Sequence, residues 1–264
     1  MTGRPGDKYH RDPTSQFVFL TLIAGCHAPA PTPPVNTNRH ADLNGTVNAH
    51  RLDGIPLFIL MATQPAKRII MGVSGASGAI YGRMLLDELE KLGTEIHLIV
   101  SPTSHIVMRE ELGITFPADR FDPSKFLGRK VKPGQIVLHN DADLAAGPAS
   151  GSFRSAGMVV CPCSMKTLGS LASGTGSSLV TRAADACLKE RRRLVLVPRE
   201  TPLNLIHLRN MTTLTEAGAV ILPAMPGFYH RPTTIEELAR HLVLKILDSL
   251  GVEHHIGYRW KDEG

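Results

Sequence analysis

The sequence has few cysteines and no apolar run long enough to cross a membrane as a helix. Its four cysteines are too few and too irregularly spaced for a disulfide framework, so a reducing compartment, by default the cytoplasm, is expected. No basic run interleaved with aromatic residues occurs, which argues against nucleic acid as a partner. The net charge of +5 is modest and fits a small anionic ligand better. We therefore expect neither a membrane nor a nucleic acid as a partner.

The prolines are unevenly distributed along the chain. With 264 residues, 42% of them hydrophobic and 20% charged, the sequence can bury one core and carry an appendage. Eight of the 19 prolines lie in residues 1–66, where no sustained helical or strand periodicity occurs. This pattern predicts a poorly structured extension over residues 1–66 and a folded domain over residues 67–264.

The extension contains an apolar run, Phe17–Cys26, which follows three basic residues and ends in Ile-Ala-Gly-Cys. This run resembles the lipidation site of a bacterial signal peptide, although it is too short to span a membrane. We favour the alternative of an over-extended start, because Met61 would begin an ordinary N-terminus immediately before the first strand-like run. A chain that starts at Met61 is expected to fold and function.

From Lys67 onward, strand-like and helix-like patterns alternate. Short apolar runs predict five strands, at 68–74, 95–100, 158–162, 194–197 and 219–222. Helical patterns predict six helices, at 79–92, 102–112, 165–172, 179–190, 203–217 and 235–250. The section 113–151 is less regular. The alternating order predicts a parallel sheet covered by helices on both faces, a doubly wound α/β three-layer sandwich of Rossmann-like or flavodoxin-like type.

In such a sheet, ligands bind at the carboxyl ends of the strands. The first predicted strand is followed by Gly75-Ala76-Ser77-Gly78, where glycines allow a close backbone approach and a hydroxyl lies at a helix N-terminus. This segment fits a phosphate site, a site for a ring edge, or a tight turn with a purely steric role. Ser101, after the second strand, is a candidate helix N-cap with the same ambiguity.

The third predicted strand ends in Cys161-Pro162-Cys163. The two cysteines are expected on the same side of the strand. No second Cys or His pair follows at zinc spacing, so buried thiols are favoured over a metal site. Ser164 and Thr167 lie at the start of the next helix, where hydroxyl and backbone N–H groups can hold an anionic part of a cofactor.

Charged and aromatic residues follow the last two predicted strands. Arg199 and Glu200 lie between prolines that fix the loop, which favours a functional pair over a solvated one. Tyr229 and His230 lie in a second proline-bounded loop, where a histidine by itself is more often structural than catalytic.

Two further cations, Arg182 and Lys189, are seven residues apart in a predicted helix. That spacing places them on one helical face, where they could converge on a phosphate. On this spacing alone, a solvated face is the favoured interpretation.

Seven segments, taken in order, resemble the UbiX-type flavin prenyltransferases. They are Gly72–Gly78 (GVSGASG), Cys161–Leu168 (CPCSMKTL), Thr181–Asp185 (TRAAD), Leu188–Arg192 (LKERR), Val197–Pro202 (VPRETP), Ile206–Met211 (IHLRNM) and Pro226–Pro232 (PGFYHRP). The match extends from residue 67 to about residue 262 and includes Arg259-Trp260. Residues 1–66 have no counterpart in it.

The resemblance implies a flavodoxin-like fold and, without a metal, transfer of a five-carbon unit from dimethylallyl monophosphate to N5 and C6 of reduced FMN. It also implies a homo-oligomer, a dodecamer with sites across subunit contacts, and a UbiD-type decarboxylase that receives the prenylated FMN, in bacteria often for ubiquinone biosynthesis. The implied FMN contacts are Gly75, Ala76, Ser77, Ser101, Ser164, Met165, Lys166, Thr167 and Arg199. The implied dimethylallyl phosphate contacts are Tyr229 and Lys245, with Arg182, Lys189, Arg199 and Glu200 around the phosphate.

The chemistry gives several of these residues roles. Phosphate leaves as flavin N5 attacks the allylic carbon, so the site needs cations that match the departing charge, namely Arg182, Lys189, Arg199 and Lys245. Closure of the new ring at C6 needs a base, either Glu200 or the released phosphate. Ser77 could orient or shuttle a proton at N5, and Glu111 aligns roughly with an acidic position of the family.

An allylic cation also needs a dry pocket, for which Phe228, Tyr229 and the loop 149–152 are candidate walls. If Glu200 is the base, Glu200→Gln should retain FMN and lose prenylation.

Two alternatives remain open at this point. A flavin-dependent cysteine decarboxylase of the related fold would share the Gly-Ala-Ser-Gly turn, but the Pro-x-Met-Asn-x-x-Met-Trp segment of those enzymes does not occur here. A non-catalytic FMN carrier would not need the set Arg199, Glu200, Tyr229 and Lys245. The mass of flavin extracted after incubation with reduced FMN and dimethylallyl monophosphate distinguishes the three.

Overall fold

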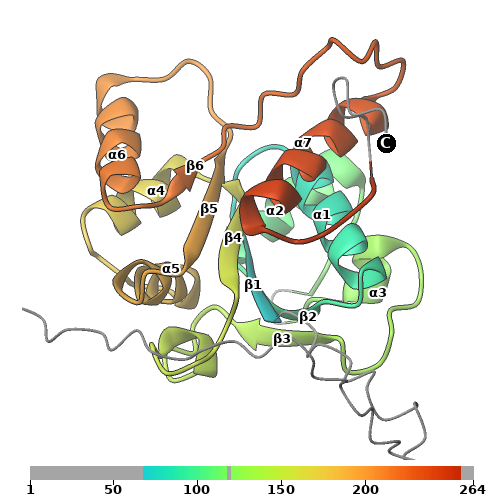
Figure 1. Ribbon diagram of the computed structural model, residues 1–264. Coiled ribbons are helices and arrows are strands. Elements are labelled where there is room, and N and C mark those ends of the chain that lie inside the picture. The colour runs from blue at the N-terminus through green and yellow to red at the C-terminus, as the bar shows by residue number, and fades with distance from the viewer. Residues whose placement is uncertain (1–67, 118–119, 257–264) are drawn as a thin grey trace, which may run out of the picture. The chain divides into compact units, whose positions relative to one another are not determined.

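A computed structural model describes residues 68–117 and 120–256 of the chain (Figure 1). The expected extension over residues 1–66, with its run Phe17–Cys26, and the Arg259-Trp260 pair lie outside these residues. The strands are β1 (Arg68–Val73), β2 (Glu95–Val100), β3 (Ile136–Asn140), β4 (Gly157–Cys163), β5 (Arg193–Pro198) and β6 (Val220–Ile221). The helices are α1 (Ala79–Lys91), α2 (Pro102–Leu112), α3 (Pro123–Leu127), the 3-10 turn η2 (Gly147–Ala149), α4 (Met165–Ala172), α5 (Leu179–Lys189), α6 (Leu205–Glu216) and α7 (Ile235–Leu250).

The strands form one parallel sheet with the order β3-β2-β1-β4-β5-β6. The chain adds strands outward from β1 on one side, then returns to β4 and adds strands on the other side. This reversal makes a switch point between β1 and β4, where the carboxyl ends of doubly wound sheets hold their ligands. The predicted doubly wound α/β class is confirmed, with the strand order typical of Rossmann-like sheets.

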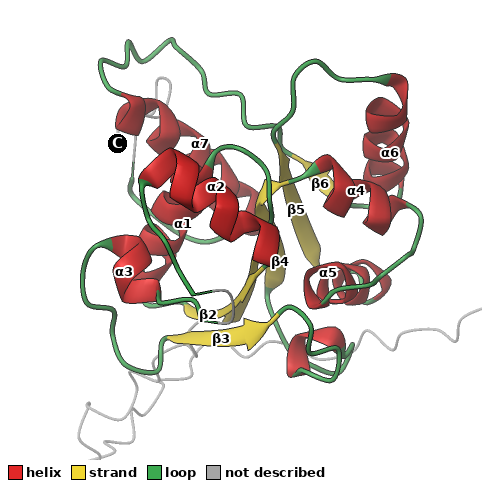
Figure 2. Ribbon diagram, turned by 180° about the vertical axis from the view of Figure 1, so that it is seen from behind, coloured by secondary structure: helices red, strands yellow, loops and turns green. Residues whose placement is uncertain are grey.

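Helices cover both faces of the sheet (Figure 1 and Figure 2). Helices α1, α2, α3 and α7 lie on one face, and α4, α5 and α6 lie on the other. Successive residues of a strand point to opposite faces, so Ile69 and Met71 of β1 pack into the first core and Ile70 into the second. Strands β1, β4 and β5 are buried along almost their whole length, which explains their continuous apolar sequences.

The section 113–151 was expected to be less regular, but it contains the strand β3 and the short helix α3. Strand β3 lies at the edge of the sheet and pairs only with β2. Val137 and Leu138 are exposed there, so the strand lacks the continuous apolar run of its buried neighbours. The predicted third, fourth and fifth strands are therefore β4, β5 and β6.

The two cysteines at the end of β4 lie on opposite faces of the sheet, which corrects the expectation of a shared side. Cys161 packs in the core beneath α1 and α7, and Cys163 packs in the core beneath α4 and α5. The pairing with β5 shifts register between Val160 and Cys163, and this irregularity breaks the two-residue alternation. Both thiols are fully buried, as expected, and burial raises the pKa of Cys163 to about 12.

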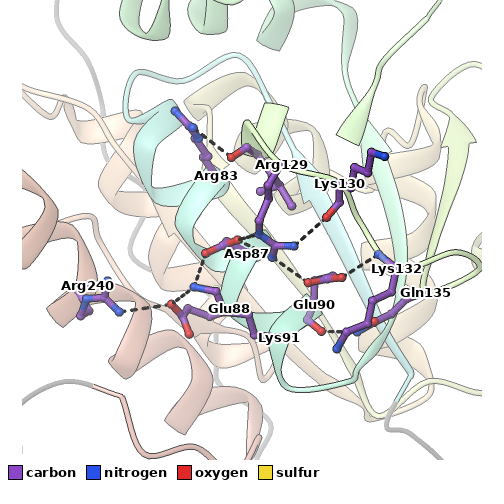
Figure 3. Close-up of polar contacts among 11 residues, drawn as sticks. Arg83, Asp87, Glu88, Glu90, Lys91, Arg129, Lys130, Lys132, Gln135 and Arg240 are labelled. Atoms are coloured by element: carbon purple, nitrogen blue, oxygen red, sulfur yellow. Dashed lines mark hydrogen bonds and ion pairs between the residues drawn. The ribbon is translucent and has the colours of Figure 1, made fainter. Parts of the chain in front are cut away.

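A cluster of charged side chains, some of them buried, joins α1 to neighbouring segments (Figure 3). We call it the α1 cluster; it consists of Asp87, Glu88, Glu90, Lys91, Arg129 and Arg240. The guanidinium of Arg129 lies 2.6 Å from Asp87 and 2.7 Å from Glu90. Lys91 lies 2.6 Å from Asp87, and Arg240 lies 3.3 Å from Glu88. Each cation of the α1 cluster thus has a carboxylate partner.

Candidate functional site

The predicted FMN contacts come from four neighbouring strand ends at the carboxyl edge of the sheet. The backbone N–H of Ser101 donates to the Val73 carbonyl at 2.9 Å, which joins the ends of β2 and β1. The N–H of Ser164 donates to the Ser74 hydroxyl at 2.8 Å, which joins β1 and β4. The N–H of Arg199 donates to a carbonyl of β4 at 3.4 Å. The structure therefore brings the predicted FMN set together along one edge.

Ser74, which sequence reasoning did not single out, connects the two sides of the switch point. Its buried hydroxyl donates to the Pro162 carbonyl at 3.0 Å and accepts the N–H of Ser164 at 2.8 Å. Because one side chain satisfies backbone groups from both strand ends, it fixes the spacing between the β1–α1 turn and the start of α4. Its position directly after an apolar strand was the available signal in the sequence.

The β1–α1 turn brings the backbone close to its neighbour. A Cβ atom at Gly75 would lie 2.6 Å from the Thr103 hydroxyl in the first turn of α2, so only glycine fits there. Gly78 has a φ of 103°, a left-handed conformation that also favours glycine. Ala76 is buried, while Ser77 is partly exposed at the tip of the turn. A turn of this kind exposes backbone to a flat ligand, which fits the predicted contact with FMN.

Glu111, in the last turn of α2, occupies the N-terminus of α1. Its carboxylate accepts the N–H of Gly78 at 2.9 Å and that of Ala79 at 2.8 Å. These N–H groups and the positive end of the helix dipole are thus already matched by a negative charge. Of the two ligands considered for this turn, a phosphate is disfavoured and the edge of a ring is favoured. Gly78, which the Glu111 carboxylate binds, directly follows Ser77 in the chain, so Glu111 lies next to the predicted FMN contacts.

The start of α4 offers the better place for a phosphate. Ser164 is the N-cap residue, and its hydroxyl accepts the N–H of Thr167 at 3.2 Å and lies 3.0 Å from the Thr167 hydroxyl. The N–H groups of Met165 and Lys166 have no acceptor within the helix. The side chain of Lys166 is exposed beside them. This end therefore combines N–H groups, hydroxyls and an ammonium, all donors that suit an anion.

Arg199 and Glu200 follow β5 directly. Arg199 is partly exposed, and the exposed Glu200 accepts the N–H of Thr201 at 3.1 Å. Tyr81, in the first turn of α1, belongs to the same neighbourhood although sequence reasoning missed it. Burial raises the pKa of Tyr81, Cys161 raises it further, and the charge of Arg199 acts in the opposite direction.

Tyr229 and Lys245 come together around one histidine of α7. The Tyr229 hydroxyl lies 2.5 Å from His241 Nε2, and the Gly227 N–H donates to His241 Nδ1 at 3.3 Å. The His230 ring stacks on the His241 ring at 5.0 Å. Lys245 lies one helical turn beyond His241 and is exposed. The predicted contacts to the dimethylallyl phosphate thus share a neighbour that the sequence did not reveal.

Arg182 and Lys189 occupy one exposed face of α5, as expected, but they lie two turns apart, about 10 Å along the helix. Lys189 is at the end of α5 that precedes β5, whereas Arg199 follows β5. A strand of this length spans about 20 Å, so one chain does not bring Lys189 to Arg199. The Lys189 ammonium pairs with Glu190 and lies against Gly151.

Three of the predicted cations have no carboxylate partner. Within residues 68–117 and 120–256, the side chains of Arg182, Arg199 and Lys245 take part in no ion pair and no hydrogen bond. They differ in this respect from the cations of the α1 cluster. Uncompensated charge of this kind is available for an anionic ligand.

The candidate walls of a dry pocket do not enclose a space in one chain. Phe228 is 70% exposed and Tyr229 is 46% exposed. The loop 149–152 lies instead beside Lys189 at the other end of α5. A cavity of about 160 Å³ opens next to Ser101, between the ends of β2 and β3.

The described residues, 68–117 and 120–256, contain neither a metal-binding cluster nor a membrane-spanning helix. Among them, no three His, Cys, Asp or Glu side chains gather as a metal site. No helix among them is long and apolar enough to cross a membrane.

Comparisons with known proteins identify the same group of relatives. The flavoprotein family model matches residues 59–242. The flavin prenyltransferase UbiX of Alkalihalophilus pseudofirmus is 48% identical over 202 residues, which cover 76% of this chain and 99% of the relative. The flavin prenyltransferase UbiX of Pseudomonas aeruginosa is 45% identical over 199 residues, which cover 75% and 95%.

Solved structures agree with these relatives. The crystal structure of AnUbiX in complex with FMN and dimethylallyl pyrophosphate has a TM-score of 0.62 and 42% identity, and the match covers 74% of this chain and all of the other. The structure of a dodecameric FMN-dependent UbiX-like decarboxylase from Escherichia coli O157:H7 has a TM-score of 0.65 and 40% identity, with 74% and 99% covered.

Proposed function

This chain belongs to the UbiX-type flavin prenyltransferases of the flavoprotein family, and we propose that it uses dimethylallyl monophosphate as its donor for the prenylation of reduced FMN. The activity is the transfer of a dimethylallyl group to FMN. Two observations carry the proposal: Arg182, Arg199 and Lys245 have no carboxylate partner among the described residues, and the glycine turn after β1 admits a flat ring. When bound, reduced FMN would supply two nucleophilic atoms. N5 would displace the phosphate from the allylic carbon and lose its proton, and C6 would add to the double bond of the transferred unit, whose neighbouring carbon gains a proton while C6 loses one.

Four strand ends hold FMN in this proposal. The turn 75–77 contacts the ring, because Glu111 already occupies the N-terminus of α1. Ser101 and the start of α4, from Ser164 to Thr167, hold the ribityl chain and phosphate. Ser77, with the Glu111 carboxylate close by, orients or shuttles the proton at N5.

The cations and Glu200 act on the donor. Arg182, Arg199 and Lys245 stabilise the phosphate as negative charge develops on it, and the Tyr229 hydroxyl holds a phosphate oxygen. Glu200 removes the C6 proton, because it is the exposed carboxylate that follows β5 beside Arg199. The resemblance of the sequence segments to the family is what favours the monophosphate over the diphosphate as donor.

A complete site needs more than one copy of the chain. Lys189 with the loop 149–152 lies at the far end of β5 from Arg199, and Phe228 and Tyr229 are exposed. We infer that a neighbouring subunit supplies Lys189 and that the exposed aromatic residues are covered across a subunit contact. The dodecameric relative supports an oligomer of this kind. Mixed oligomers of Lys189→Ala and Arg199→Ala subunits should then regain activity that neither variant has alone.

The product leaves as a cofactor for another enzyme. We propose that a UbiD-type decarboxylase receives the prenylated FMN in the cytoplasm. The family name of the relatives and the absence of disulfides among the three described cysteines support this assignment.

Mass spectrometry of the extracted flavin tests the function. The protein is incubated without oxygen with reduced FMN and either dimethylallyl monophosphate or the diphosphate. The monophosphate should yield FMN enlarged by one five-carbon unit, faster than the diphosphate does. Unchanged FMN with both donors would overturn the proposal in favour of an FMN carrier, and carbon dioxide release from an added acid would favour a decarboxylase.

A further inference from the structure

We propose that His241 is a positioning residue for the prenyl donor and that it orients the Tyr229 hydroxyl as a hydrogen-bond donor toward the donor phosphate. This inference rests on the proposed function, in which Tyr229 contacts that phosphate. His241 lies in α7 and touches neither FMN nor the donor in the proposal. It acts through Tyr229.

The hydrogen bonds of His241 determine which ring nitrogen carries the proton. The Gly227 backbone N–H donates to Nδ1 at 3.3 Å, so Nδ1 must offer a lone pair. A neutral imidazole has a single N–H, which is then on Nε2. Nε2 lies 2.5 Å from the Tyr229 oxygen. The Nε2–H of His241 therefore donates a hydrogen bond to the Tyr229 oxygen. If Tyr229 donated instead, the proton of the ring would be on Nδ1, and the N–H groups of Gly227 and Nδ1 would point at each other.

The direction of this hydrogen bond decides what Tyr229 can do. Because the Tyr229 oxygen accepts from His241, its own O–H proton points away from the ring. A hydroxyl that accepts one hydrogen bond is polarised and donates a stronger one. A phosphate oxygen, which can only accept, is matched by such a hydroxyl. A Tyr229 that instead donated to His241 would turn its lone pairs toward the phosphate, and the two would repel.

The surroundings of His241 fix its position. The His230 ring stacks on it at 5.0 Å with an interplanar angle of 13°, and the Tyr229 ring meets it edge-on at 5.2 Å. His241 is buried on a long helix, so its ring moves little. A Cβ atom at Gly227 would lie 2.8 Å from the Tyr229 ring, so the loop can close on His241 only with glycine at this position.

Electrostatics keep His241 neutral, as the arrangement requires. Burial lowers the pKa of His241, and the neighbouring His230 and the Lys245 ammonium lower it further. Among residues 68–117 and 120–256, the titratable groups that face the ring are Tyr229 and His230 from the loop and Lys245 from α7 itself. Because Lys245 lies one turn after His241, one segment of α7 positions both proposed phosphate contacts.

The test compares KM for the prenyl donor among variants of the full chain. His241→Phe keeps a stacked ring and removes both hydrogen bonds. We expect its KM for dimethylallyl monophosphate to rise about tenfold, the effect of one well-placed hydrogen bond, with kcat and FMN affinity nearly unchanged. His241→Gln can still donate through its side-chain amide and should restore most of the affinity. His254→Gln, at another buried histidine of the chain, is the matched control and should leave KM unchanged.

A double-mutant cycle separates positioning from general damage. Tyr229→Phe should raise KM as His241→Phe does, and the double variant should be no worse than either, since both changes remove one contact. Additive effects, or an unchanged KM in His241→Phe, would overturn the inference.

A third measurement compares only the wild type with Tyr229→Phe, so it does not depend on whether His241→Phe folds. Protonation of His241 expels the Gly227 N–H from Nδ1, and the pKa of His241 is lowered, so the KM advantage of the wild type over Tyr229→Phe should persist from pH 8 to about 6.5 and shrink only as the pH falls well below that value. A constant advantage would overturn the inference. Failure of the wild type to form prenylated FMN would instead overturn the proposed function on which the inference rests.

Discussion

The α1 cluster and the carboxyl edge of the sheet are both rich in cations, but only the α1 cluster balances them. In the α1 cluster, Arg129 contacts Asp87 and Glu90 (Figure 3). Lys91 contacts Asp87 and Glu88, and Arg240 contacts Glu88. At the edge, Arg199 has no ion pair with any described residue. A cavity of about 580 Å³ adjoins the α1 cluster and is larger than the cavity of about 160 Å³ near Ser101.

In the proposed function, the site lies where charge is unbalanced and not where the cavity is largest. Cations that are already neutralised gain little from an added anion, because binding it would break existing ion pairs. Cations without partners break no existing ion pair when an anion binds, so their attraction to the anion is gained in full. A large cavity with balanced charges is therefore a weaker candidate than a shallow edge where positive charge is left over.

The largest expected effect lies at the carboxyl edge. Glu200→Gln keeps the shape of the side chain and removes the proposed base, so prenylation should slow by about 10²–10⁴-fold. FMN affinity and melting temperature should stay at the wild-type values, because Glu200 is exposed and pairs with no described cation. Rapid-quench assays measure the prenylation rate, equilibrium titration measures the FMN affinity, and thermal unfolding measures the melting temperature. Full activity would remove Glu200 from the mechanism.

The next prediction sets one arginine of each region against the other. Arg199→Gln should lower the prenylation rate by about 10²–10³-fold, the range for loss of one group that stabilises developing charge, with little change in unfolding free energy. Arg129→Gln should keep activity and lose about 1–3 kcal/mol of stability, because the buried Glu90 loses a partner. Denaturation and activity assays on both variants test this prediction. If Arg129→Gln lost as much activity as Arg199→Gln, the proposed difference between the two regions would be wrong.

A smaller effect distinguishes the two regions by pH. Burial by itself raises the pKa of Glu90, but hydrogen bonds from Arg129 and the Lys132 N–H outweigh it and leave the pKa below its usual value. The resulting stability is fully present above the unfolded pKa of about 4.3 and is lost as the pH falls through the lower folded pKa. The difference in melting temperature between the wild type and Arg129→Gln should therefore shrink below about pH 4. Arg199→Gln should show no such pH dependence.

The smallest effect is expected from shortening the chain. A protein that starts at Met61 retains every described element, from Arg68 onward, and with them both regions. Its FMN affinity and prenylation rate should equal those of the full chain. Loss of FMN binding in the shortened protein would show that residues 1–60 contribute to the domain.

Much of the fold could be predicted from the sequence because its buried strands have an uninterrupted apolar pattern. Strand β1 is an example, and the polar residues after it mark the carboxyl edge correctly. Strand β3 was missed because an edge strand with Val137 and Leu138 exposed has no such pattern. The shared side expected for Cys161 and Cys163 was wrong, since a register shift cannot be read from spacing alone.

The parts of the site that could not be predicted depend on contacts between distant residues. The Ser74 hydroxyl bonds to a carbonyl 88 residues away, and Glu111 reaches Gly78, 33 residues away. In the sequence, His241 is one residue of an amphipathic helix, and only the folded structure shows its contact with the Tyr229 loop. Residue types and spacing identify the groups that face a ligand, whereas the groups that hold them in place become visible only in three dimensions.

The burial of Cys163 has a consequence for the working life of the enzyme. Reduced flavins pass electrons to molecular oxygen and release hydrogen peroxide, which oxidises thiolates. Cys163 lies one residue before Ser164 in the proposed FMN site, yet its pKa of about 12 leaves a thiolate fraction on the order of 10⁻⁵ at neutral pH. This thiol beside the proposed site is thus almost wholly protonated, so peroxide formed during turnover in air should oxidise Cys163 only slowly.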